Sequence, residues 1–165
     1  MLIVTHTSTD AMKKPITKEE ALLSMASLCA RSEQCPSDIY RKLRLKGLSH
    51  SASLDVIEDL KERKFVDERR FARGFTNDKV RFSAWGRRKI GAALAAKRIP
   101  SELIRTALAE IDPGEYEDAA LRAARAKSSG LDLELYEDRV KLYRHLLSRG
   151  FESALASKLV KSLRQ

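Results

Sequence analysis

LRLKGL, at residues 43–48, is the first of three related hexapeptides in this chain, and the others are LAAKRI at 94–99 and LLSRGF at 146–151. Each copy has a leucine, two variable residues, a basic residue, then glycine or arginine, then an apolar residue. The copies begin 51 and 52 residues apart. The same apolar pair lies nine and twelve residues beyond each copy: Ile57 and Leu60, Leu108 and Ile111, Val160 and Leu163. This shared register predicts three copies of one structural unit.

Apolar residues recur at helical spacing within each copy, and no run of period-two alternation competes with them. Thr17 and Glu20 form a capping-box pattern, and Asp112-Pro113 offers a cap followed by a proline at the first helical position. Gly47 and Gly150 are suited to end helices in the left-handed conformation. The sequence therefore predicts an all-α fold with three helices in each unit.

Particular helices are expected at particular places. One runs over 36–46 with Ile39, Tyr40 and Leu43 inward. The next, over 50–64, has Leu54, Ile57 and Leu60 inward, and Asp67 caps its successor. Ser83 is predicted to cap the helix that carries Trp85, Ile90 and Leu94, and Pro100 to lie in the first turn of the helix after it. Later inward stripes are Ala119, Ala120, Ala123 and Ala124, then Tyr136, Val140, Tyr143 and Leu147.

The expected organisation is a flexible tail at 1–16 followed by three-helix repeats at 17–64, 65–112 and 113–165. Each repeat is too small for a large core, so neighbouring repeats should pack end to end. We expect an elongated, curved molecule, monomeric, with a long concave face. Such a face suits an extended partner better than a small substrate.

Charge is the most informative feature for function. The chain has a formal net charge of +9, and residues 65–112 carry +5 of it. Lys79–Pro100, with the single tryptophan, holds seven of the 32 Lys and Arg residues and no acid. A basic excess favours polyanions or acidic proteins as partners. The candidate binding residues are Arg81, Arg87, Arg88, Lys89, Lys97 and Arg98.

These six cations cannot share one helical stripe, and Lys97 and Arg98 also suit a helix C-terminus electrostatically. DNA phosphates and acidic protein patches both remain open as their partners. Trp85 could stack on a base, although a tryptophan at this place more often joins the core.

Catalysis is not expected. The three histidines form no paired motif, and the sequence holds no phosphate-binding loop, nucleophile elbow or metal-ligand cluster. We therefore expect neither enzyme activity, metal nor cofactor. No apolar run reaches membrane-spanning length. Cys29 and Cys35 are expected to be free thiols in a reducing compartment, with Cys29 buried.

Several stretches resemble the RecX family of regulators of the RecA recombinase. They are Phe65 to Ala72 (FVDERRFA), the later positions Gly86, Ile90, Leu94, Lys97 and Ile99, the N-terminal Ala21-Leu22, Arg31-Ser32 and Lys46-Gly47, and Arg149-Gly150-Phe151. The resemblance covers about residues 17–164. One departure is Arg98, where the family usually has glycine, and we expect a turn there that needs no left-handed residue.

The resemblance implies three tandem three-helix repeats in a curved, cytoplasmic protein. It implies binding in the groove of the RecA–DNA filament, mainly inhibition of ATP hydrolysis, coprotease activity and strand exchange, and a role in recombination, DNA repair and the SOS response. It also implies binding to single- and double-stranded DNA.

Two alternatives remain. A helix-turn-helix transcription regulator would also use two helices joined by a short turn, although such proteins usually present one recognition helix and a dimer interface. A nucleic-acid enzyme would need the acidic or metal cluster that the sequence lacks.

Overall fold

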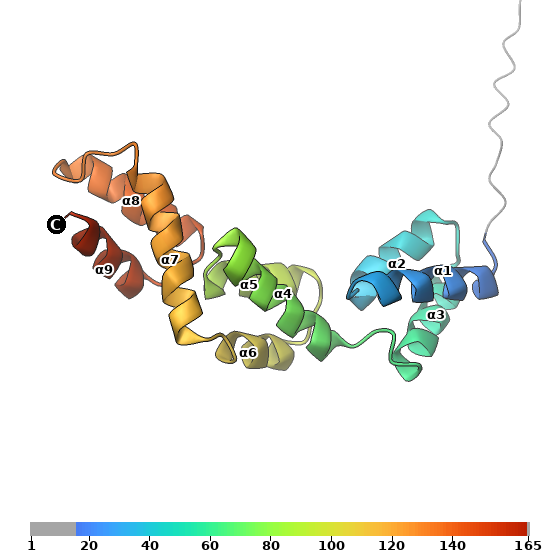
Figure 1. Ribbon diagram of the computed structural model, residues 1–165. Coiled ribbons are helices and arrows are strands. Elements are labelled where there is room, and N and C mark those ends of the chain that lie inside the picture. The colour runs from blue at the N-terminus through green and yellow to red at the C-terminus, as the bar shows by residue number, and fades with distance from the viewer. Residues whose placement is uncertain (1–15, 165) are drawn as a thin grey trace, which may run out of the picture.

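The computed structural model describes residues 16–164, which form nine α-helices and no strand. The tail expected at 1–16 lies almost wholly outside the described residues. The helices are α1 (Lys18–Arg31), α2 (Pro36–Leu45), α3 (His50–Glu62), α4 (Glu68–Ser83), α5 (Arg87–Ala96), α6 (Ser101–Ala109), α7 (Pro113–Ser128), α8 (Tyr136–Ser148) and α9 (Ser153–Leu163). They form three groups of three in a curved row, which confirms the predicted all-α repeat fold (Figure 1).

The three hexapeptides form the same turn at the ends of α2, α5 and α8. In each copy the last residue donates its N–H to the carbonyl of the first: Leu48 to Leu43, Ile99 to Leu94, and Phe151 to Leu146, at 3.1–3.2 Å. This six-to-one bond is the Schellman motif, which needs a left-handed residue just before the last position. The closing apolar residues Leu48, Ile99 and Phe151 are all buried.

Gly47, Arg98 and Gly150 occupy that left-handed position, with φ of 86°, 60° and 92°. The expectation that Arg98 would avoid this conformation was therefore wrong. The hydrogen bonds of the turn fix the backbone regardless of the side chain, and a non-glycine residue held there costs of order 1–3 kcal/mol.

Two buried clusters hold the molecule together. One is formed mainly by α1–α3 and includes Ile39, Leu43 and Leu60. The other runs continuously from α4 to α9 and also takes in Cys35, from the start of α2. The first cluster extends to Val66, just past the predicted boundary at residue 64, and the predicted boundary at residue 112 falls inside the second cluster. The boundaries themselves stay predictions.

The second and third groups meet through backbone. The Gly86 N–H donates to the Arg149 carbonyl at 2.8 Å, and the Arg88 N–H donates to the Gly150 carbonyl at 3.1 Å. A β-carbon on Gly86 would lie 2.2 Å from backbone atoms of Gly150. The start of α5 therefore packs directly against the α8–α9 turn, because neither Gly86 nor Gly150 has a side chain.

Local expectations at the helix starts met mixed outcomes. The Thr17–Glu20 capping box and the caps at Asp67 and Asp112 are present. Ser83 does not cap α5: it ends α4, Ala84 turns left-handed with φ 48°, and Gly86 is the N-cap. Trp85 therefore precedes α5. Pro100 is the N-cap of α6 and lies just outside its first turn.

Two inward stripes were misjudged. Leu54 is 45% exposed and Val56 is buried in its place. In α8, Tyr136 is 70% exposed, while Leu142 and Leu146 are fully buried. Periodicity alone cannot fix which edge of an apolar stripe faces the core. The two cysteines are free, and Cys29 is only half-buried, contrary to expectation, whereas Cys35 is buried.

Gly86→Ala is expected to lower the free energy of unfolding by more than about 2 kcal/mol, because the new methyl group overlaps backbone that cannot move aside. Gly74→Ala is the matched control. Gly74 lies within α4 with nothing within 4 Å of a β-carbon, so this substitution should raise the free energy of unfolding by about 0.5–1 kcal/mol. Urea denaturation measures both. Equal effects of the two substitutions would contradict the close junction.

Candidate nucleic-acid interface

A concave, acid-free surface lies where the end of α4 meets α7 and α8. A pocket of about 410 Å³ opens there, and the described residues that line it include Phe82, Arg122, Lys127, His145 and Arg149 but no carboxylate. With the neighbouring Lys89, we call these residues the basic surface. It joins the second and third helix groups, so only the folded chain brings its parts together.

Two of its arginines help to end α4. Arg122 donates through Nη2 to the carbonyls of Arg81 at 2.8 Å and Val80 at 3.3 Å. Arg149 donates to the carbonyls of Ser83 and Ala84. The last carbonyls of a helix have no intrahelical partner and carry its negative pole, so guanidinium groups stabilise them. These two side chains have a structural role whatever else they bind.

Three cations of the basic surface lie near one histidine. Burial lowers the pKa of His145 below its ordinary value, and the nearby charges of Arg149, Lys127 and Lys89 lower it further. Burial first, and then the positive field of these three side chains, favours the neutral form of the imidazole. An anion bound at this place would relieve that field, and the electrostatics of the surface favour phosphate or carboxylate ligands.

Aromatic rings border the basic surface. Phe82 is 82% exposed at the end of α4, where nothing covers it. Trp85 is half-buried against the second core, with the ammonium groups of Lys79 and Lys89 at 4.8 and 4.6 Å from its ring centre. Trp85 thus has the core position expected of most tryptophans, and Phe82 is the ring available to stack on a base.

Two of the six predicted cations link the second helix group to the third. Arg81 makes a two-point ion pair with Glu115 of α7, at 2.7 and 3.1 Å. Arg87 lies over the Tyr116 ring, 3.9 Å from its centre, and 3.5 Å from Glu152. Exposed pairs of this kind add little to stability, but they hold both side chains against the third helix group.

Tyr116 completes the contact with Arg87. Its hydroxyl accepts the Arg87 backbone N–H at 3.0 Å and donates to Glu152 at 2.8 Å. Burial, with the hydrogen bond to Glu152 adding to it, raises the pKa of Tyr116 to about 12. The tyrosine therefore stays neutral and serves as a fixed donor and acceptor at the start of α5.

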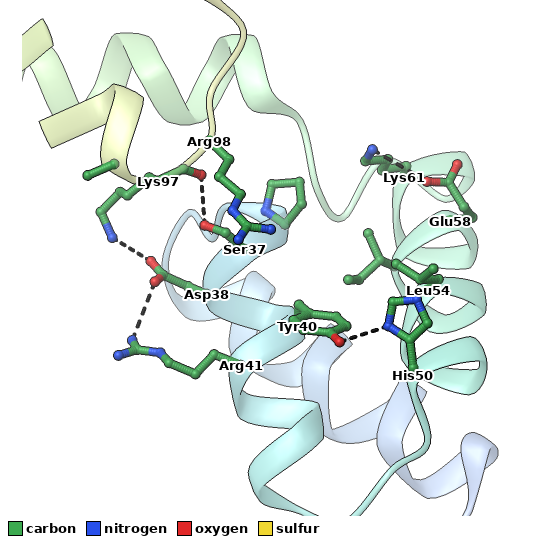
Figure 2. Close-up of a pocket in the computed structure, with 13 residues that line it drawn as sticks. Ser37, Asp38, Tyr40, Arg41, His50, Leu54, Glu58, Lys61, Lys97 and Arg98 are labelled. Atoms are coloured by element: carbon green, nitrogen blue, oxygen red, sulfur yellow. Dashed lines mark hydrogen bonds and ion pairs between the residues drawn. The ribbon is translucent and has the colours of Figure 1, made fainter. Parts of the chain in front are cut away.

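Lys97 and Arg98 lie at the other end of α5, toward the first helix group. Lys97 pairs with Asp38 at 2.6 Å, while Arg98 extends beside Ser37 (Figure 2). Arg88 and Arg98 are exposed and Lys89 is half-buried. Within residues 16–164, none of these three side chains forms an ion pair. The structure thus divides the predicted set in two and does not gather it in one patch.

Sequence reasoning missed Phe82, Arg122, Lys127, His145 and Arg149. Phe82 lay inside the acid-free stretch but was not singled out, and the other four come from a repeat with little excess charge. No sequence spacing places α7 and α8 beside the end of α4. A residue-by-residue charge count therefore could not find the basic surface.

Within the described residues, no cluster of His, Cys, Asp and Glu side chains has the grouping a metal ion needs. Likewise, no described helix is both long enough and apolar enough to cross a membrane.

Comparison with known proteins gives the family. The model of "RecX, second three-helix domain" matches residues 67–108, which hold α4, α5 and most of α6. A regulatory protein RecX from Prosthecochloris aestuarii is 32% identical over 121 residues, covering 73% of this chain and 78% of that protein. This chain belongs to the RecX family.

Other RecX proteins extend the picture. Regulatory protein RecX of Clostridium botulinum (strain Eklund 17B) is 31% identical over 134 residues, which span 79% of this chain but only 62% of the relative. A crystal structure of RecX from Lactobacillus salivarius superposes with a TM-score of 0.75 over 88% of this chain and 96% of that one, at 15% identity. The fold is thus the RecX fold, and the family is one of non-enzymatic regulators.

The basic surface predicts a particular acid response. Because the pKa of His145 is lowered on folding, the unfolded chain binds this proton first as the pH falls. Stability should therefore be lost as the pH drops from the ordinary histidine value of about 6.5 toward the folded value. Lys127→Ala should raise the pKa of His145, as followed by NMR titration of its ring protons. A pKa unchanged by this substitution would show that Lys127 does not act on the imidazole.

Proposed function

We propose that this RecX-family chain binds RecA–DNA filaments and limits their ATP hydrolysis, coprotease activity and strand exchange. Its role would be to restrain recombination, DNA repair and the SOS response in the cytoplasm, acting as a monomer. Membership of the RecX family is the observation that carries this proposal. Since the chain spans only about six tenths of some relatives, the activity of the whole protein is part of the proposal.

The shape supports a filament as the partner. The nine helices of the described residues lie in a curved row, which gives a long surface (Figure 1). A groove between protomers is itself an extended, curved track. An elongated binder in such a groove contacts several protomers at once, which lets one molecule act on more than one ATP site.

Contact with DNA is assigned to the basic surface. Lys89 and Lys127 would neutralise phosphates, His145 would gain a proton, and Phe82 would stack on a base. Of the residues expected from sequence, Arg88 and Lys89 are free to join this contact. Arg81, Arg87 and Lys97 are engaged between helix groups, so their removal would act mainly through stability.

The decisive measurement is ATP hydrolysis by RecA on single-stranded DNA with increasing amounts of this protein. We expect inhibition at well below one molecule per RecA protomer. Phe82→Ala with Lys127→Glu should raise the half-inhibiting concentration at least tenfold, because a stacking ring and a phosphate contact are lost together. Arg105→Glu, which reverses an exposed charge on α6 outside the basic surface, is the matched control and should inhibit like the unmodified protein.

Salt dependence separates DNA from protein contacts. Removing one phosphate contact should reduce the slope of log affinity against log salt by roughly 0.7 for single strands. If Lys89→Gln lowers affinity without changing this slope, the lysine contacts protein and not phosphate. If the protein leaves RecA unaffected but binds one duplex sequence tightly, a helix-turn-helix regulator becomes the better function.

A further inference from the structure

A second cleft, of about 710 Å³, opens between the first helix group and the end of α5 (Figure 2). On one side Tyr40 of α2 hydrogen-bonds to His50 of α3 at 2.8 Å, and Leu54 lies next to this pair. On the other side Lys97 and Arg98 come from the α5–α6 turn. The cleft is not part of the basic surface and shares no lining residue with it.

The cleft exists because the junction between the first and second helix groups uses different contacts from the junction between the second and third groups. Between the second and third groups, backbone N–H groups of α5 reach the turn of α8 directly. At the matching place between the first and second groups, Cys35 stands where Gly86 does, and the Ser37 hydroxyl reaches the Lys97 carbonyl at 2.7 Å. Side chains now separate the two groups, and the space beside them is left open.

Arg98 is the residue that the turn accommodates least well. The equivalent residues are Gly47 and Gly150, and all three have positive φ. Non-glycine residues in this conformation persist where the surrounding structure holds them, and they cluster at functional sites. The Arg98 side chain crosses from α5 toward Ser37 and forms no ion pair within residues 16–164 (Figure 2). Its guanidinium is available to a ligand.

The cleft combines an apolar floor with a mainly cationic border. Leu54 and Ile57 supply the floor, and Leu54 is 45% exposed, far more than a core leucine. The charged residues that line it are Arg41, Lys61, Lys97, Arg98, Asp38 and Glu58. Lys97 and Arg41 pair with Asp38, and Lys61 pairs with Glu58, so the excess is two positive charges.

We propose that this cleft binds an acidic segment of a partner protein, with an apolar side chain on Leu54 and carboxylates at Arg98 and Arg41. A nucleic-acid backbone fits less well, because it carries a charge at every nucleotide and would pass Asp38 and Glu58. A peptide can place neutral or apolar residues opposite them. The proposal goes beyond DNA contact and does not depend on which protein supplies the segment.

A bound segment would also set the angle between the first two helix groups. It would touch Arg41 and Leu54 in one group and Arg98 in the other. Groups that meet without backbone-to-backbone hydrogen bonds rotate more easily than groups fixed by them. Filling the cleft would therefore stiffen the curve of the whole molecule.

The test uses a fluorescein-labelled peptide, Glu-Asp-Leu-Phe-Asp-Glu, followed by fluorescence anisotropy and by amide chemical shifts of the full chain. We expect saturable binding with shifts centred on α2, α3 and the α5–α6 turn. Leu54→Glu should weaken binding at least tenfold. Arg98→Gly should weaken it at least threefold while raising the melting temperature, a combination that a purely structural role would not give.

Phe82→Ala, on the basic surface, is the matched control and should bind the peptide normally. A peptide with glycine in place of its two apolar residues should bind at least fivefold more weakly. Three results would overturn the proposal: no shifts in the cleft at millimolar peptide, binding unaffected by Leu54→Glu, or displacement of the peptide by an oligothymidylate that binds in the same cleft. Because the peptide assay contains no RecA, its outcome is separate from that of the ATP hydrolysis test.

Discussion

The contact between Gly86 and Gly150 constrains most of the rest of this molecule. Two backbone segments meet there without intervening side chains, and the segment at the start of α5 donates two hydrogen bonds to the α8–α9 turn, at 2.8 and 3.1 Å. This closeness fuses α4–α9 around one continuous core and seats the start of α5 on the turn of α8. It also carries α8 to the end of α4, so that Arg149 caps that helix and the basic surface forms.

The equivalent junction between the first and second helix groups is made by side chains, and it leaves the cleft beside Arg98. Cys35 replaces the glycine and is buried in the core of the next group, while Ser37 and Asp38 bind the turn that follows α5. Burial pushes the pKa of the Asp38 carboxyl up, but hydrogen bonds from Lys97 and Cys35 lower it by more, so the ion pair persists to acidic pH. The junction between the second and third groups is thus closed and lies beside the basic surface, whereas the junction between the first and second groups is open and holds the cleft.

Basic residues therefore serve two purposes in this fold. Some hold the helix groups together: Arg81 on Glu115, Arg87 on Tyr116, and Lys97 on Asp38. Others, such as Arg88, Lys127 and Arg98, are exposed to partners. Charge count cannot separate the two kinds, because what differs is whether a carboxylate from another repeat lies within reach.

The sequence by itself determined the helical class, the threefold repeat and its register, because hydrophobic spacing and the hexapeptide turns are local properties. Gly47 and Gly150 could be assigned left-handed turns for the same reason, and the family resemblance rested on that register. Only the tertiary structure decided that Arg98 is left-handed, that Leu54 and Tyr136 face outward, and that Phe82 meets Lys127 and His145. Arg98 is held left-handed by the hydrogen bonds of its own turn despite its side chain, and the packing of whole helices decides which way Leu54 and Tyr136 face. Phe82 meets Lys127 and His145 only because the second repeat packs on the third, and no spacing within a repeat encodes that contact.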